Sequence, residues 1–373
     1  MSKASSPGCA HELVPVLDDH RTSHRLSGRK FDPMPLPFLS ADSSSAPQLA
    51  RTPGFSASST TRPSISDTAL KIAAHQWKPP PLDLMNPNPA RIRDFYLGGD
   101  QSFALERNWC INATRLVPCL QQAYRDERDF LGRAIRFAKR RRRIHRFLVI
   151  GAGLPFARPV HDDVLSHPHG MVVYAEPEEY VSARLNLFVP DLAQSATVQG
   201  DFLEPGTILF AEAVRALLRD GSPVCLVLTG VLETIADTGD AAAALQCYTE
   251  RLPPGSLVIA THATVDGLDT GDAADAADAA LAEQRRLLCC TYGRTAHRPP
   301  RHLRTTGQLR DLLAGLKLVQ PGITYTSAWH NPHPAREVRP VESLCLAAVA
   351  GVRRARPRRS TSAGVRVAGA EAR

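Results

Sequence analysis

The sequence lacks several features that mark whole classes of protein. None of its eight cysteines forms a C-x-x-C pair, and no zinc-finger spacing occurs. No apolar run approaches the roughly 20 residues of a membrane-spanning helix. The opening stretch MSKASSPGCAHELV has no apolar core of the kind that secretory signals carry. These absences predict a soluble, metal-free protein of the reducing cytoplasm, with its thiols acting as small core residues.

The two ends of the chain have little apolar material. Residues 1–85 are rich in Ser and Pro, as in SASSTTRPSISDT and QWKPPPLDLM, and residues 354–373 form a basic tail. Such segments bury too little apolar surface to offset their conformational entropy, so we expect both to be disordered. The formal net charge of +8 therefore comes partly from the ends.

A basic run, AKRRRRIHR, covers residues 138–146. It could contact nucleic acid or another anionic surface. It is also typical of a solvated helix end, where cations suit the C-terminal dipole. No aromatic stacking residues are interleaved with these charges, which favours the helix end and disfavours nucleic acid as a partner. The sequence carries no signal for an oligomeric state.

Residues 86–145 have a helical pattern. The segment ARIRDFYLGGDQSFALERNWCINATRLVPCL predicts two helices separated by a turn at Gly98 and Gly99, and DERDFLGRAIRFAKRRR predicts an amphipathic helix. We expect a helical cap in which Arg91, Asp94 and Tyr96 face a ligand and the glycine turn lets the segment move as a lid. The alternative is an ordinary helix pair that covers one edge of a sheet.

Strands and helices alternate through residues 146–353. The strand candidates are RFLVIG, MVVYAE, ATVQGDF, PVCLVLTGVL and SLVIATHA, followed by KLVQPGITYTSAW and ESLCLAAVAGV. Alternation with helices predicts an α/β fold, a parallel Rossmann-like sheet with helices on both faces. The link 329–342 has no room for a helix, so the last two of the seven strands should be antiparallel.

The loop FLVIGAGLPF follows the first of these strands. Ligands of parallel sheets lie beyond the carboxyl ends of the strands, and glycines there let backbone approach a ligand closely. A dinucleotide loop would have a third glycine where this chain has Phe156. The loop therefore suits a ligand without a diphosphate, although a glycine turn can also simply connect strand to helix.

Two acidic residues follow the next two strands. Glu176 ends the second strand, where a carboxylate can accept bonds from both ribose hydroxyls, and Asp201 follows the third, where it could bind an adenine amino group. Either could instead be an ordinary turn or helix-start acid. Together with Gly151, Ala152 and Gly153 they predict a site for the nucleoside of S-adenosylmethionine (SAM).

Several segments also resemble, in order, the bacterial S-adenosyl methyltransferase family, first described as a domain of unknown function. They are NPARIRDFYLGGDQSFALER, ERDFLGRAIRF, FLVIGAGLP, VVYAEPE, PGSLVIATHAT and LKLVQPGITYTSAW, within residues 86–353. The resemblance implies the class I methyltransferase sheet with a helical N-terminal extension, SAM as cofactor, and a SAM-binding domain over residues 146–353. It also makes Gly98 and Gly99 part of the family's entry signature.

The chain departs from the family pattern at positions that would face the chemistry. Val149 replaces an acid before the Ile-Gly of the loop, Asp100 replaces a lysine, and Glu233 replaces a histidine, whereas Glu176 keeps the ribose acid in kind. These departures leave open an inactive SAM-binding homologue with a regulatory or scaffold role.

Methyl transfer needs chiefly positioning, with a base only where the acceptor must lose a proton. The candidates are Glu233 and His262, after the fourth and fifth strands; the alternatives are a solvated loop acid and a backbone-bonded histidine. We therefore predict a SAM-dependent methyltransferase acting on a small molecule. A nucleotide-linked oxidoreductase or a nucleic-acid binder is the remaining alternative.

Overall fold

The computed structural model describes residues 83–154, 159–189, 193–268, 276–295, 301–332 and 339–352. The predicted disordered tail at 354–373 lies outside these ranges, and so does all but the last part of the N-terminal segment 1–85. Within the described ranges, no helix combines the length and the apolar character that crossing a membrane requires.

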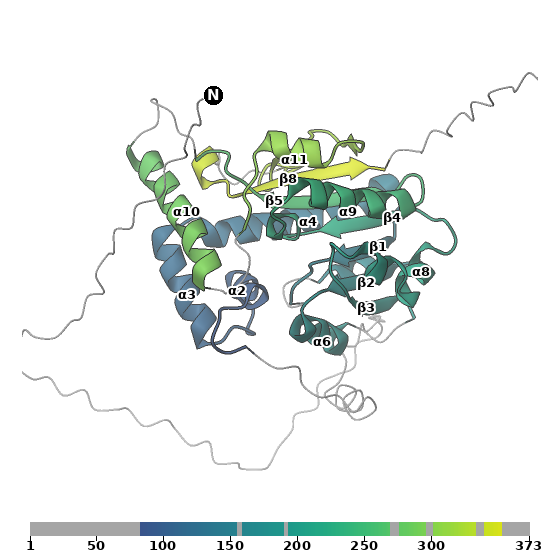
Figure 1. Cartoon of the computed structure of the whole chain (residues 1–373). Helices are drawn as coiled ribbons and strands as arrows, with labels where there is room; N and C mark the ends of the chain where they lie inside the picture. Colours follow the sequence, from purple (N-terminus) through teal and green to yellow (C-terminus); the bar gives the residue numbers. More distant parts are fainter. Residues whose placement is uncertain are drawn as a thin grey trace, which may run out of the picture. The chain divides into compact units, whose positions relative to one another are not determined.

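Across the described ranges, one sheet of eight strands organises the chain (Figure 1). The strands are β1 (Arg146–Ile150), β2 (Met171–Glu176), β3 (Ser195–Gln199), β4 (Val224–Leu228), β5 (Leu257–Ala263), β6 (Lys317–Leu318), β7 (Thr324–Tyr325) and β8 (Cys345–Gly351). Their order is β3-β2-β1-β4-β5-β8-β6, with β7 also pairing with β8. The pairings among β1 to β5 are parallel, and β8 runs antiparallel to β5. The predicted mostly parallel sheet with an antiparallel last strand is confirmed.

The predicted count of seven strands was wrong. The segment expected as one strand, KLVQPGITYTSAW, forms the two short strands β6 and β7, which both pair with β8. Pro321 and Gly322 separate them; proline cannot donate to a strand ladder, and Gly322 has a φ of 94°. The intervening turn therefore breaks the strand that the apolar pattern had suggested.

Helices cover both faces of the sheet. They are α5 (Val160–Val164), α6 (Glu179–Phe188), α7 (Pro205–Leu209), α8 (Glu212–Leu218), α9 (Thr238–Arg251), α10 (Ala276–Thr295) and α11 (Thr306–Leu312), with 3₁₀ turns η1 (Leu232–Thr234) and η2 (Pro340–Glu342). The apolar spacing of TILFAEAVRALLRD predicts one helix, but the structure has two, α7 and α8, which are separated at Phe210 and Ala211.

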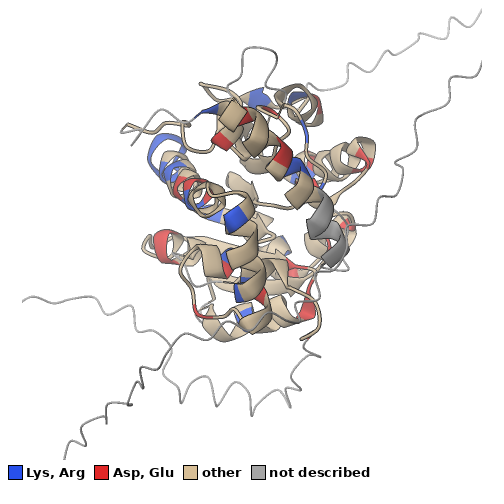
Figure 2. Cartoon of the chain, turned by 90° about the vertical axis from the view of Figure 1, so that its left-hand side faces the viewer, with Lys and Arg blue, Asp and Glu red and all other residues tan. Residues whose placement is uncertain are grey.

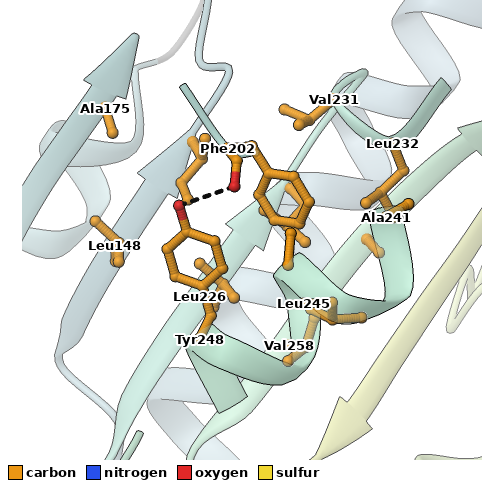
Figure 3. Close-up of a cluster of buried hydrophobic side chains, with 14 of the residues drawn as sticks. Leu148, Ala175, Phe202, Leu226, Val231, Leu232, Ala241, Leu245, Tyr248 and Val258 are labelled. Atoms are coloured by element: carbon orange, nitrogen blue, oxygen red, sulfur yellow. Dashed lines mark hydrogen bonds between the residues drawn. The ribbon is translucent and has the colours of Figure 1, made fainter. Parts of the chain in front are cut away.

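Successive side chains along a strand enter the two hydrophobic cores on opposite faces of the sheet. In β1, Leu148 and Ile150 enter the core that is covered by α8, α9 and α11, whereas Phe147 and Val149 enter the core under α4, α5 and α6. Figure 3 shows the first of these cores, where the Tyr248 hydroxyl donates to the carbonyl of Phe202 at 3.3 Å and the two rings stack.

The helical cap described before the sheet consists of α2 (Pro89–Tyr96), α3 (Ala104–Leu116) and α4 (Leu120–Arg142). Asn88 caps α2, since its side-chain oxygen accepts from the backbone of Ala90 and Arg91. The 23-residue α4 joins the cap core through Tyr124 and the sheet core through Phe130. Its basic last turn carries the first part of the run 138–146, and the last residue of that run, Arg146, begins β1. On the face in Figure 2 basic and acidic residues are interspersed.

Candidate active site

The glycine loop after β1 follows a path that needs glycine. Gly151 and Gly153 have φ of 72° and 68°. A Cβ added to Gly151 would lie 2.2 Å from Cγ2 of Val231, in the turn after β4. Side chains are therefore excluded at Gly151 both by backbone conformation and by space, and the loop packs tightly against the neighbouring strand end.

Glu176 lies beside this loop. The backbone N–H of Gly153 donates to its carboxylate at 2.6 Å, and the residue is only 5% exposed. Burial raises the pKa of Glu176 to about 7; the nearby carboxylate of Glu178 adds to the rise, and the Gly153 N–H and the Arg93 cation oppose it. The buried acceptor expected for ribose hydroxyls is therefore next to the glycines, as the sequence predicted.

Asp201 lies at the same edge of the sheet. The N–H of Gly200 donates to the Glu176 carbonyl at 3.1 Å, which holds the start of this turn against the end of β2. The Asp201 side chain is exposed and accepts from the N–H of Leu203 at 2.8 Å, so it has the turn-forming contact. Its contact with adenine stays a prediction.

Helix α2 lies over the glycine loop and encloses a pocket of about 40 Å³, here called the loop pocket. Arg93 and Asp94 line it from α2, Val149 and Ala152 from β1 and its loop, and Thr229 from the end of β4. The cap is thus in contact with the predicted cofactor loop. The sequence analysis did not identify Arg93 as a site residue, although it lies in the same helix as Arg91, two positions further on.

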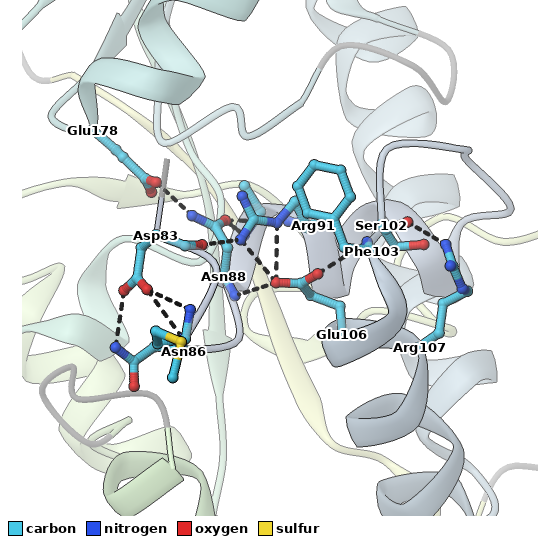
Figure 4. Close-up of polar contacts among 11 residues, drawn as sticks. Asp83, Asn86, Asn88, Arg91, Ser102, Phe103, Glu106, Arg107 and Glu178 are labelled. Carbon is cyan, nitrogen blue, oxygen red and sulfur yellow. Dashed lines mark hydrogen bonds and ion pairs between the residues drawn. The ribbon is translucent and has the colours of Figure 1, made fainter. Parts of the chain in front are cut away.

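Arg91 and Tyr96 do not line this pocket. Arg91 is 1% exposed and forms an ion pair with Glu106 at 2.9 Å, donates to the Asp83 carbonyl at 2.9 Å, and lies over the Phe103 ring (Figure 4). The Tyr96 hydroxyl donates to the Cys110 carbonyl at 3.0 Å. Both side chains hold the cap together instead of facing a ligand, because their side of α2 packs against α3.

The glycine turn after α2 acts through Asp94. The N–H of Gly99 donates to the Asp94 carbonyl at 2.8 Å, and a Cβ at Gly99 would lie 2.0 Å from Oδ1 of Asp94. The N–H of Gln101 donates to Oδ2 at 2.8 Å. Gly98 has a φ of 83°. The turn thus fixes a pocket-lining carboxylate, and a lid movement stays a prediction.

A second pocket, of about 110 Å³, lies between α3, α4 and α10, the turn η1, and the ends of β5 and β8; we call it the cap pocket. Glu127 lines it and forms an ion pair with Arg93 at 3.0 Å, so one ion pair joins the two pockets. Thr261 donates to Glu127 at 2.6 Å and accepts from the Gly230 N–H at 3.2 Å. No sequence signal connected these residues.

Glu233 lines the cap pocket from η1. It is 3% exposed, accepts from the Ala263 N–H at 2.9 Å, and forms an ion pair with Arg301 at 3.1 Å. The solvated loop acid considered above therefore does not describe it. Glu233 is a buried, fixed carboxylate at the end of the fourth strand.

His262 faces away from both pockets. Its Nδ1 lies 2.6 Å from the Ala263 carbonyl, and Arg304 donates to its Nε2 at 2.8 Å, which fits a neutral ring with the proton on Nδ1. Burial lowers the pKa of His262, and the Arg304 cation adds to this against the opposing effects of Glu233 and the Ala263 carbonyl. The backbone-bonded alternative describes its contacts, and a catalytic role stays a prediction without geometric support.

The strand order, the glycine loop and the acid after β2 define the class I methyltransferase fold. The model of the S-adenosyl methyltransferase family matches residues 75–354, so the chain belongs to that family.

Two solved structures are similar over nearly their whole length. A protein from Thermobifida fusca YX proposed to be a methyltransferase is 25% identical, with a TM-score of 0.63, covering 74% of this chain and 99% of its own. A DUF574 family protein from Streptomyces avermitilis MA-4680 is 27% identical, with a TM-score of 0.62, covering 72% and 98%. The comparison with curated proteins found no match.

The family's cofactor is SAM, and the residues present fit it. Glu176 offers a buried carboxylate to hydroxyl donors, Gly151 and Gly153 keep the loop free of side chains, and Thr229 and Ala152 line the adjoining pocket. In the part of the chain that the structure describes, no group of three His, Cys, Asp or Glu side chains is arranged to hold a metal ion.

Proposed function

We propose that the protein methylates a small molecule that binds in the cap pocket. The Arg93–Glu127 ion pair carries the proposal, because Arg93 lines the loop pocket and Glu127 lines the cap pocket. A ligand in each pocket would approach this pair from opposite sides. Such a juxtaposition suits a group transfer between two bound molecules.

Glu176, Gly153 and Ala152 would hold the cofactor, with Asp201 at the adenine end. SAM supplies a methyl group that its sulfonium has already activated, so the protein's main task is to position the acceptor. The cap contributes Arg93 and closes the site from the side of α2. Its apolar walls would keep water from the reacting groups.

We assign Glu233 to orient the acceptor and, where it carries a protic group, to accept its proton. The Ala263 N–H and Arg301 fix both carboxylate oxygens, so the carboxylate meets an acceptor in one orientation. Glu127, held by Arg93 and Thr261, is a second acceptor of protons on the same pocket. His262 remains a candidate from the sequence alone.

Catalytic inactivity is the second candidate function, and Val149 favours it. This apolar side chain lines the loop pocket at the position where the family has an acid. The site would then bind SAM without turning it over, in a regulatory or scaffold role.

Calorimetric titration of the full chain with SAM and with its demethylated product tests the proposal. We expect micromolar binding that Glu176→Ala abolishes and that Glu204→Ala, which removes an exposed carboxylate between β3 and α7, leaves unchanged. Binding followed by release of the demethylated product with an acceptor supports the enzyme. Binding without turnover across an acceptor panel supports the inactive homologue, and no binding overturns both.

A further inference from the structure

Two carboxylates and two guanidinium groups line the cap pocket: Glu127, Glu233, Arg285 and Arg301. Glu127 is paired with Arg93 at 3.0 Å, and Glu233 with Arg301 at 3.1 Å. Each of these carboxylates therefore has its own cation. Because the partner of Glu127 comes from the loop pocket, the second lining cation of the cap pocket, Arg285, belongs to neither pair.

Arg285 reaches the pocket wall from α10 and is 4% exposed. Its guanidinium donates to two backbone carbonyls, that of Val341 at 2.7 Å and that of Thr264 at 3.0 Å. Among the described residues, none brings a carboxylate to ion-pair distance from it. Burial lowers the pKa of Arg285, as expected for a cation taken out of water without a counterion.

The two carbonyl oxygens accept only some of the hydrogen bonds that the Arg285 guanidinium can donate, and they carry no negative charge to balance it. A guanidinium has five N–H donors, and its planar fork matches the two oxygens of a carboxylate. The rest of the wall is mainly apolar, including Leu288 on the turn of α10 that follows Arg285, and Leu120 and Tyr124 on α4. The pocket thus combines one buried cation with surfaces that suit an apolar ring or chain.

We propose that the cap pocket takes an apolar acceptor that carries a carboxylate, and that this carboxylate pairs with Arg285. The assignment rests on the proposed function, since it names the chemical class of the acceptor. Arg285 is a positioning and specificity residue here, not a participant in the transfer.

The two ends of the cap pocket lie at different positions along β5 and the residue that follows it. Thr261 bonds to Glu127, and Thr264, three residues further on, bonds to Arg285. Three residues of extended chain span roughly 10 Å, so the cation lies well away from the ion pair that adjoins the loop pocket. The acceptor's carboxylate would therefore point away from the cofactor, with its reactive group toward Glu127. Glu233, which accepts from the Ala263 N–H, would lie beside the acceptor between these two ends.

The size of the pocket agrees with a single ring. One water needs about 10–15 Å³ of such space, so 110 Å³ accommodates roughly ten non-hydrogen atoms. A ring with a carboxylate at one end and a hydroxyl at the other fits both the volume and the separation.

Two probes of equal size separate charge from shape. 4-Hydroxybenzoate and 4-hydroxybenzamide have the same number of non-hydrogen atoms, and near neutral pH only the first is anionic. Ligand-observed NMR titration of the full chain should show that the acid binds about tenfold more tightly than the amide. Equal binding of the two, tighter binding of the amide, or binding of neither would overturn the assignment.

Variants in α10 test whether Arg285 is the cation that binds the carboxylate. Arg285→Gln should remove the preference for the acid, and Arg285→Lys should keep part of it. Arg286→Gln is the matched control, because Arg286 is half exposed, pairs with Glu283, donates to the Leu268 carbonyl and does not line the cap pocket. A preference that survives Arg285→Gln in a folded protein, checked by its thermal unfolding, contradicts the proposal.

SAM titrations on the same samples keep the two proposals apart. If SAM binds while acid and amide bind alike, the methyltransferase proposal stands and the carboxylate assignment fails. If the acid is preferred through Arg285 but SAM does not bind, the pocket is an acid-binding site and the proposed function fails.

Discussion

The buried carboxylate after β2 makes cofactor binding pH-dependent. Glu176 has a pKa of about 7 in the free protein because it is buried, against 4.5 for an ordinary glutamate. Ribose hydroxyls donate most strongly to an ionised carboxylate, so the protonated form is poorly competent to bind SAM. Binding should therefore favour deprotonation and release protons below about pH 7.

The magnitude follows from the fraction of ionised Glu176. With a pKa of about 7, roughly one tenth of the protein is ionised at about pH 6 and nine tenths at about pH 8. The apparent Kd for SAM scales inversely with the competent fraction, so it should fall about tenfold between these pH values. Calorimetry in two buffers of different ionisation enthalpy measures both the Kd and the protons released.

Glu176→Gln is the control for this reasoning. Its amide oxygen can still accept from the Gly153 N–H but cannot ionise, so binding should be weaker and independent of pH over the same range. A wild-type Kd that stays constant between about pH 6 and pH 8, or an equal pH dependence in the Gln variant, would refute the role of Glu176.

The raised pKa of Glu176 also makes the stability of the fold depend on pH, in the opposite direction from an acid whose pKa is lowered by a salt bridge. The pKa of Glu176 is raised in the folded state, so the folded protein holds its proton more tightly than the unfolded chain does. Stability should be unaffected below the ordinary pKa of 4.5, fall as pH rises from there to about 7, and stay lower above that. The shift corresponds to about 3 kcal/mol, which urea unfolding of wild type and Glu176→Gln across this pH range would measure.

Two further substitutions test the loop and the histidine. Gly151→Ala should lower the free energy of unfolding by about 1–3 kcal/mol and weaken SAM binding, because the added Cβ would clash with Val231. Gly221 is the control, since it has a similar φ of 69° but open space around it. If calorimetry shows weaker SAM binding for Gly151→Ala and not for Gly221→Ala, the clash is the cause. His262→Phe should destabilise the fold by about 1–3 kcal/mol, because Arg304 loses an acceptor, yet leave the SAM Kd unchanged. A changed Kd with normal thermal unfolding would instead connect His262 with the cofactor.

The sequence by itself determined the sheet and the cofactor edge. Alternating apolar runs and helices specify parallel strands, and the carboxyl ends of such strands share one edge. Glu176 and the loop from Gly151 to Gly153 are each attached to a strand end, so local position was enough to bring them together. The exception was the strand at 317–329, where the Pro321–Gly322 turn outweighed the apolar pattern.

Only the tertiary structure decided which cap residues face the site. On α2, Arg91 and Arg93 are two positions apart and chemically alike, but one pairs with Glu106 inside the cap and the other with Glu127 between the pockets. Which of them meets the sheet depends on how α2 is rotated against α3 and α4. That rotation is set by packing between elements distant in the chain, and no local periodicity encodes it.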